Sequence, residues 1–138
     1  MHLEGGGAAG GMGAGLYAFC GAKLRPGIEI VTDALHLADI VADADLVITG
    51  EGRIDSQTIH GKVPVGVARV AKRYNLPVIA IAGSLTADVG VVHEHGLDAV
   101  FSVIYSICTL DEALENAAEN VRMTARNVAA VLKMGQVL

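Results

Sequence analysis

The residues with the most evident chemical capacity lie between Thr49 and Lys62, directly after a short apolar run, 46–48. Within fourteen positions this stretch holds three glycines, two carboxylates, an arginine, a lysine and a histidine. Fixed cations can hold a phosphate or a carboxylate, whereas a carboxylate can accept a proton or bind Mg²⁺. The residue types therefore predict a site for a polyanion or a sugar acid.

Side-chain chemistry suggests a role for each charged residue. Asp55 is the candidate base or Mg²⁺ ligand, and Lys62 is the candidate clamp for a phosphate or carboxylate. Arg53 would be a second clamp, and Glu51 a metal-binding or structural carboxylate. Further residues are expected to contact substrate or nucleotide: Gly50, Gly52, Gln57, Thr58, His60, Gly61, Gly83 and Ser84. For the last two, a plain turn is an equally good interpretation.

The alternation of apolar and polar segments predicts how these residues are positioned. Strands are expected at 46–49, 78–82 and 99–104, with a loop over 50–61 and a helix over 62–74. Strand–helix repeats of this kind predict an α/β fold, a Rossmann-like parallel sheet with flanking helices. Ligands of such sheets bind at the carboxyl ends of the strands, which is where the loop begins.

The remaining segments complete two expected parts of the chain. Residues 1–24 form a glycine-rich segment and a helix that would belong to a domain interface, and residues 25–138 form the Rossmann-like domain. One or two short helices are expected over 28–42 and another over 88–95. Thr109 and Glu112 predict a capping box that opens one long helix. Its apolar seam is Leu110, Leu114, Ala117, Val121, Ala125, Val128 and Leu132.

Composition narrows the class of partner. The formal net charge is −5 and aromatic residues make up 4% of the chain, which argues against a nucleic-acid binder. No apolar run is long enough for a membrane span, and no secretory leader is evident. Cys20 and Cys108 lie in apolar segments and are expected to be buried, reduced thiols, which predicts a cytoplasmic protein.

Two known loop types are excluded, and one simpler interpretation stays open. Val63 follows Gly61-Lys62 where a Walker A loop needs Ser or Thr, and no G-x-S-x-G hydrolase elbow is present. The charged residues could also form a solvated salt-bridge cluster on an ordinary loop. The length of the loop and its place at the carboxyl end of a strand favour a ligand site.

The long stretch 45–62, followed by Pro64-Val-Gly-Val-Ala68, closely resembles the signature of bacterial glycerate kinases of the type that serves glycolate, glucarate and galactarate breakdown. Segments 6–15, 26–30, 78–84 and 110–120 resemble other parts of that family. The resemblance implies two α/β domains, one built from both ends of the chain, with a cleft between them. This chain would then be a partial domain, the C-terminal third of such a kinase.

The resemblance also implies an activity: transfer of the γ-phosphoryl group of ATP to a hydroxyl of glycerate, with Mg²⁺. The alternatives are a non-catalytic module that binds a nucleotide or sugar acid, and a structural fragment. Because three parallel strands leave two open edges, we expect either a homo-oligomer or pairing with the N-terminal part of the same enzyme.

Overall fold

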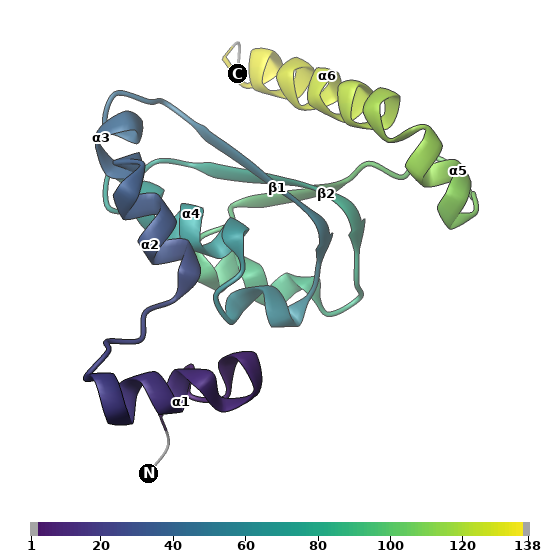
Figure 1. The fold of residues 1–138 in the computed structure, drawn as a ribbon. Coiled ribbons are helices and arrows are strands. Elements are labelled where there is room, and N and C mark those ends of the chain that lie inside the picture. Colours follow the sequence, from purple (N-terminus) through teal and green to yellow (C-terminus); the bar gives the residue numbers. More distant parts are fainter. Residues whose placement is uncertain (1–2, 137–138) are drawn as a thin grey trace.

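The computed structural model describes residues 3–136. Residues 1–2 of the predicted segment 1–24 and residues 137–138 of the predicted segment 25–138 lie outside the described residues. Three helices precede the first strand, strands and helices then alternate, and two helices follow the last strand (Figure 1). The elements are α1 (Ala8–Cys20), α2 (Gly27–Ala34), α3 (Leu37–Val41), β1 (Val47–Ile54), η1 (Ser56–Ile59), α4 (Val63–Lys72), β2 (Val78–Leu85), η2 (Val89–His95), β3 (Ala99–Ser102), α5 (Leu110–Glu115) and α6 (Ala117–Gly135), where η is a 3-10 helix.

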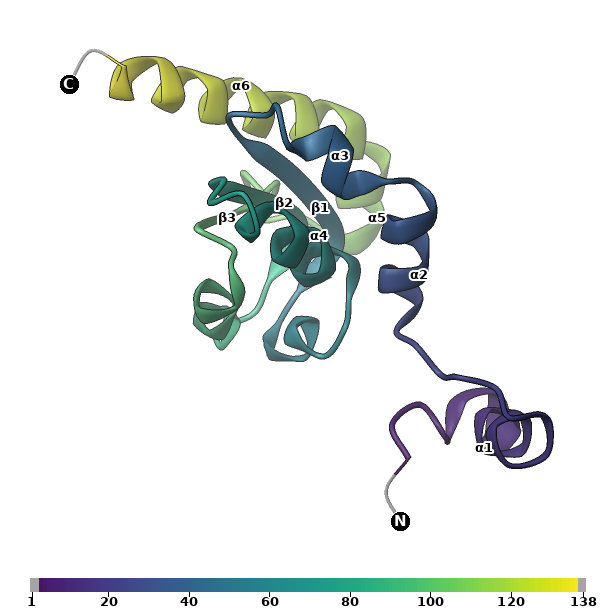
Figure 2. The ribbon, with the colours of Figure 1, turned by 90° about the vertical axis from the view of Figure 1, so that its left-hand side faces the viewer.

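The strands form one parallel sheet in the order β1-β2-β3. Each connection crosses over the sheet, through α4 from β1 to β2 and through η2 from β2 to β3. Helix α4, with α2 and α3 beyond it, lies on one side of the sheet, and α6 lies on the other (Figure 2). The predicted α/β class, with a parallel sheet and flanking helices, is confirmed.

The first two strands extend further than the sequence predicts. Pairing of β1 with β2 runs from Val47 opposite Val78 to Ile54 opposite Leu85. Residues 50–54, expected in a loop, therefore belong to β1, and residues 83–85 belong to β2. The third strand is shorter than expected and ends at Ser102. The length of each strand depends on hydrogen bonding to the backbone of the neighbouring strand, which the residue types of one segment do not predict.

A pair of glycines allows this extended pairing. Gly52 and Gly83 lie opposite each other between the paired residues Glu51–Ala82 and Arg53–Ser84. A Cβ on Gly83 would lie 2.5 Å from the Gly52 carbonyl oxygen. Val47 and Ile54 both belong to the same core cluster although they are seven positions apart. In a regular strand this odd spacing would place the two side chains on opposite faces of the sheet. The alternation of β1 side chains between the two faces of the sheet is therefore shifted by one residue within the strand. The close approach of the two backbones at the glycines accommodates this shift.

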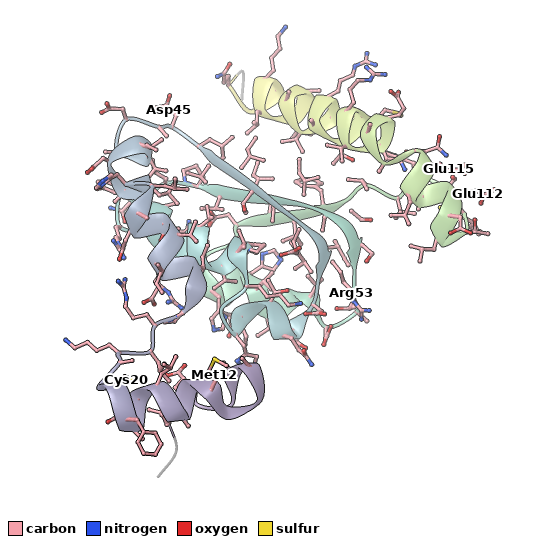
Figure 3. All side chains as sticks on the ribbon, viewed as in Figure 1. Met12, Cys20, Asp45, Arg53, Glu112 and Glu115 are labelled. Atoms are coloured by element: carbon pink, nitrogen blue, oxygen red, sulfur yellow. The ribbon has the colours of Figure 1, made fainter. Side chains whose placement is uncertain are left out.

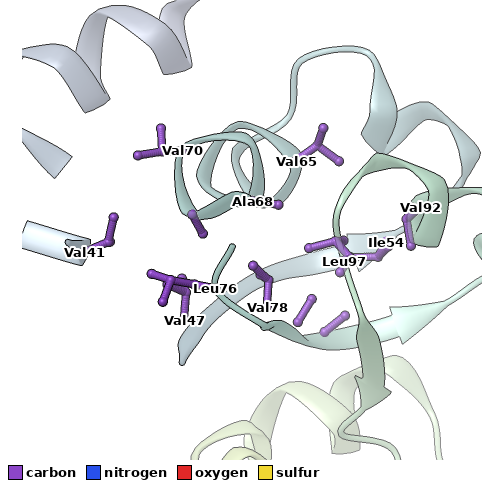
Figure 4. Packing of buried hydrophobic residues seen from close by; sticks show 13 residues of the cluster. Val41, Val47, Ile54, Val65, Ala68, Val70, Leu76, Val78, Val92 and Leu97 are labelled. Carbon is purple, nitrogen blue, oxygen red and sulfur yellow. The ribbon is translucent and has the colours of Figure 1, made fainter. Parts of the chain in front are cut away.

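The hydrophobic core lies between the sheet and α4 (Figure 4). Val65, Ala68 and Ala71 of α4 are buried against Val78 and Leu97. Pro64 stands in the first turn of α4, where its missing N–H removes no helical hydrogen bond. The predicted amphipathic helix after the loop is confirmed, although it ends at Lys72 rather than at residue 74.

The C-terminal helix departs from the prediction in two ways. The predicted capping box is present, with Thr109 and Glu112 bonded in both directions, but the helix breaks at Asn116 into α5 and α6. The apolar seam is also mostly exposed: Leu110 is 73% and Leu114 65% exposed. Helical periodicity predicts that a face is apolar, but not that a neighbouring element covers it.

The glycine-rich segment forms α1, which lies apart from the sheet (Figure 3). Ala9, Gly10 and Gly11 have left-handed or positive-φ backbone angles, so the first turn is interrupted. Phe19 is 92% exposed, and both cysteines are exposed free thiols. The expectation of buried thiols is wrong, because the apolar segments that carry Cys20 and Cys108 are not covered by other described residues.

Candidate functional site

The charged residues gather where β1 ends. Arg53 and Ile54 are the last residues of the strand, and Asp55 begins the connection to α4. Figure 3 shows Arg53 near the carboxyl end of β1, where it is paired with Ser84 of β2. The loop of the site is therefore 55–62, shorter than the 50–61 predicted from sequence. The charged cluster thus lies at the carboxyl end of β1, as expected from the sequence, and its role as a ligand site stays a prediction.

Asp55 caps the short helix η1. Its Oδ1 accepts a hydrogen bond from the backbone N–H of Gln57 at 3.0 Å and from the Thr58 hydroxyl at 3.3 Å. The backbone N–H of Asp55 donates in turn to Thr58 Oγ1 at 3.1 Å. Thr58 is fully buried, so its hydroxyl faces Asp55 rather than solvent. The local sequence thus fixes the carboxylate by a reciprocal cap.

Two cations flank the same carboxylate. Lys62 Nζ lies 3.3 Å from Oδ1, and Arg53 Nε lies 3.5 Å from Oδ2. The Asp55 side chain is 17% exposed, whereas those of Lys62 and Arg53 are 40% and 65% exposed. The charged ends of the two cations are therefore accessible to a ligand that approaches from solvent.

Opposing influences set the pKa of Asp55. Burial is the largest single influence and raises it, but the hydrogen bond and charge of Lys62, with the Gln57 N–H and the Thr58 hydroxyl, together outweigh burial. The pKa of Asp55 therefore lies below its ordinary value, and the carboxylate is ionised at neutral pH. Asp55 is thus an anion flanked by two exposed cations.

Lys62 reaches Asp55 because of the turn that precedes it. Gly61 has φ of +93°, a conformation that strains any residue with a Cβ. Lys62 then takes an extended conformation as the N-cap of α4, and its carbonyl accepts the Gly66 N–H at 3.2 Å. The glycine redirects the chain so that one residue both starts the helix and points its ammonium group back at η1.

Seven of the other predicted residues line two separate hollows, whereas Gln57 and Thr58 line neither. A largely apolar groove of about 600 Å³ runs between the β1–β2 edge and α5–α6. It is lined by five of the candidates, Gly50, Glu51, Gly52, Gly83 and Ser84. His60 and Gly61 instead line a cleft of about 730 Å³ between α4 and the segment that joins α1 to α2.

The second cleft also holds two residues that sequence reasoning missed. Arg25 and Arg69 line it beside His60. Both are already paired with carboxylates: Arg25 with Asp33, and Arg69 with Glu29 at 3.2 Å. Their only sequence signal was positive charge near Pro26 and on the polar face of α4, which is common on surfaces. The structure thus brings Arg53, Asp55 and Lys62 together but not all the predicted residues.

Two further features are absent from the part of the chain that the structure describes. Over residues 3–136, no group of three or more His, Cys, Asp and Glu side chains is arranged to hold a metal ion. Among the described helices, none is both long and apolar enough to cross a bilayer.

Comparison with known proteins places this arrangement in a family. The family model described as "Glycerate kinase family" matches residues 1–133. The chain is 67% identical over 133 residues to glycerate 2-kinase of Escherichia coli K12, and 53% identical over 135 residues to glycerate kinase of Bacillus subtilis 168. These matches cover 96% and 98% of this chain but only 35% of each relative.

A solved structure agrees with the sequence comparison. The chain superposes with a TM-score of 0.74 on the crystal structure of a protein from Salmonella typhimurium LT2 that is provisionally named glycerate kinase 2. The two are 80% identical, and the match covers 97% of this chain and 34% of that one. The chain thus spans about a third of the length of the relatives it matches, and it belongs to the glycerate kinase family.

Proposed function

We propose that this chain supplies the anion-binding edge of a kinase that transfers the γ-phosphoryl group of ATP to a hydroxyl of glycerate. The observation that carries the proposal is the ionised Asp55 carboxylate between Lys62 and Arg53 at the carboxyl edge of the sheet. Two relatives that match over nearly the whole chain are named glycerate 2-kinase and glycerate kinase, which supports glycerate as the acceptor.

The two cations would hold the anionic groups of the reactants. Phosphate and glycerate carboxylate both carry oxygens that accept from a lysine or arginine, and charge-assisted hydrogen bonds of this kind are short and strong. Lys62 and Arg53 have their charged ends exposed, so each can turn from Asp55 toward such an oxygen. The same contacts would stabilise negative charge on the transferring group.

Asp55 would orient the attacking hydroxyl. An ionised carboxylate accepts a hydrogen bond from the hydroxyl, and it takes up the proton as the new oxygen–phosphorus bond forms. A carboxylate with a lowered pKa is a weak base, which suits a transition state in which the proton leaves late. Thr58, expected from sequence to touch the ligand, is fully buried, and we assign it to holding Asp55 in place.

The residues fit Mg²⁺ and ATP unequally. Asp55 accepts from two uncharged donors and faces two cations, so it does not fit as a direct metal ligand. Glu51 fits better, because the Gly52 N–H occupies only its Oε1, at 3.1 Å. Mg²⁺ in kinases is held by one or two carboxylates together with phosphate oxygens, whose charge it neutralises.

The groove offers a place for the nucleotide. Gly52 has open space where a Cβ would stand, so a phosphate could approach its backbone, and the Ser84 hydroxyl lies in the same groove. A Cβ on Gly50 would instead lie 2.9 Å from the Ile81 carbonyl oxygen, and one on Gly83 would lie 2.5 Å from the Gly52 carbonyl oxygen. We therefore assign the nucleotide contact to Gly52 and Ser84, and a structural role to Gly50 and Gly83.

A non-catalytic binding module is the second candidate, favoured by the coverage of about a third of each relative. The exposed apolar residues favour a partner in either case: Leu132 and Val131 of α6 are 42% and 61% exposed. We propose that a second copy, or the rest of the same enzyme, covers them in the cytoplasm. Sedimentation of the purified chain tests the second copy, and a monodisperse monomer at tens of micromolar would contradict it.

An ADP-release assay with ATP, Mg²⁺ and glycerate tests the activity. It is run on this chain and on a chimera in which residues 1–133 replace the matching third of the E. coli relative. We expect turnover by the chimera, and a loss in kcat of about 10² or more for Asp55→Asn. Asp43→Asn is the control, since Asp43 has no side-chain partner among residues 3–136. An unchanged kcat in Asp55→Asn would mean that Asp55 forms a surface ion pair and has no catalytic role.

A further inference from the structure

The groove beside the site has one wall, made by α5 and α6, that few contacts hold in place. The two helices contribute several of the apolar residues that line the groove: Leu110, Ala113, Leu114, Ala117 and Val121. Helix α6 packs against β2, on the side of the sheet opposite α4 (Figure 2). Within their described residues, however, the two helices bury only Thr124 and Val128. Apolar packing alone therefore fixes the position of this wall weakly.

Two hydroxyl groups join the wall to the segment that follows β3. The Tyr105 hydroxyl oxygen lies 2.7 Å from Thr124 Oγ1, and the Thr124 hydroxyl donates to the Asn120 carbonyl at 3.0 Å. Because a threonine hydroxyl carries a single proton, Tyr105 is the donor in the first bond. Thr124 is 3% exposed, so little water competes for its oxygen. The tyrosine thus holds α6 through a buried acceptor.

The segment that carries Tyr105 is itself fixed to the sheet. The Val103 N–H donates to the Ala82 carbonyl of β2 at 2.9 Å, and the Ile104 N–H donates to Ser102 Oγ at 3.1 Å. Val103 and Ile104 also line the groove. Tyr105 therefore extends from the edge of the sheet, where the backbone is held, to the wall that faces it.

The bond from Tyr105 to Thr124 has no substitute. Over residues 3–136, no other hydrogen bond or ion pair joins α5 or α6 to a residue before Thr109. The remaining side-chain contacts of the two helices are local, such as those of Glu112 with Thr109 and of Arg122 with Glu119. Loss of the Tyr105 hydroxyl would therefore remove the polar link between the wall and the rest of the described fold.

We propose that Tyr105 is a positioning residue, whose hydroxyl holds α6 over the sheet and so keeps the groove in the form that binds the nucleotide. The effect on nucleotide binding rests on the proposed function, whereas the hydroxyl contact does not. The apparent affinity of a ligand falls in proportion to the fraction of protein in the binding-competent form. Removal of the hydroxyl should therefore weaken ATP binding and leave the catalytic step unchanged.

The test compares Tyr105→Phe and Thr124→Val in the chimera. Tyr74→Phe is the control, since Tyr74 is similarly exposed and its hydroxyl has no hydrogen-bond partner among residues 3–136. We measure ATP binding with Mg²⁺ by calorimetry, hydrogen exchange of the peptide that spans residues 117–131, and kcat with both KM values. Tyr105→Phe should speed that exchange and weaken ATP binding, each by about fivefold. Thr124→Val should do the same, and the double variant should lose no more, because both changes break one contact.

The kinetic constants separate this role from general destabilisation and from the proposed function. Positioning of the wall predicts a higher KM for ATP with kcat and KM for glycerate unchanged, whereas a smaller folded fraction would lower kcat and change neither KM. Unchanged ATP affinity in Tyr105→Phe, or an equal loss in Tyr74→Phe, overturns the proposal, as does an unmutated chimera that binds no ATP. If the unmutated chimera binds ATP but does not phosphorylate glycerate, the proposed function is refuted, and the ATP titration still decides the role of Tyr105.

Discussion

Replacing Gly83 by alanine should destabilise the protein, whereas the same change at Gly52, directly across the ladder, should not. A Cβ on Gly83 would lie 2.5 Å from the Gly52 carbonyl oxygen, roughly 1 Å inside the separation at which heavy atoms attract. The obstacle is backbone, so the strands must move apart. On Gly52, the added carbon meets no atom within 4 Å. Neither glycine has a positive φ, so backbone strain does not separate the two cases.

The magnitude follows from these contacts. Overpacking of this kind costs about 1–3 kcal/mol, so the Gly83→Ala urea midpoint should fall by about 1 M for a protein of this size. Gly52→Ala should range from no change to a gain of about 1 kcal/mol, because alanine restricts the unfolded chain. Urea unfolding followed by circular dichroism measures both. Equal losses of stability in the two variants would show that the strands do not approach as closely as described, and would refute the reasoning.

Three further predictions concern the site and its frame. Thr58→Val should lower stability by about 1–3 kcal/mol in the same unfolding assay, since it leaves the partly buried Asp55 N–H without an acceptor. Lys62→Met should mainly raise KM in the ADP-release assay if the lysine binds ground and transition states alike, and a change confined to kcat would contradict this.

The third prediction concerns Asp98. Hydrogen bonds from Lys72 and from the Val78 N–H lower the pKa of Asp98 against the effect of burial. The ionised Asp98 therefore stabilises the folded state fully above its unfolded-state pKa of about 3.9. This stabilisation is lost as the pH falls through the lower pKa of the folded state. Asp98→Asn should cost about 1 kcal/mol at pH 7, a modest figure because the side chain is half exposed. The gap to wild type should narrow below about pH 4; a constant gap would argue against the linkage.

The sequence alone determined the local features. Pro64 at the start of a helix, the capping box of Thr109 and Glu112, and the apolar runs of the three strands each depend on residues within a few positions of one another. The charged cluster was also predictable, because Arg53, Asp55 and Lys62 are close in sequence at the end of a strand. The resemblance to glycerate kinases rests on the same continuous stretch, and the comparisons confirm it.

Tertiary structure decided what depends on distant partners. β1 extends through Gly50 and Gly52 because β2 pairs with it, and Thr58 is buried because η2 packs on η1. The exposure of Cys20 and Cys108 depends on which elements cover them. Side-chain type and spacing determine which groups can react, but pairing and burial are properties of two segments at once. For that reason only the folded chain shows that Gly50, Gly52 and Gly83 line a groove to which Lys62 does not contribute.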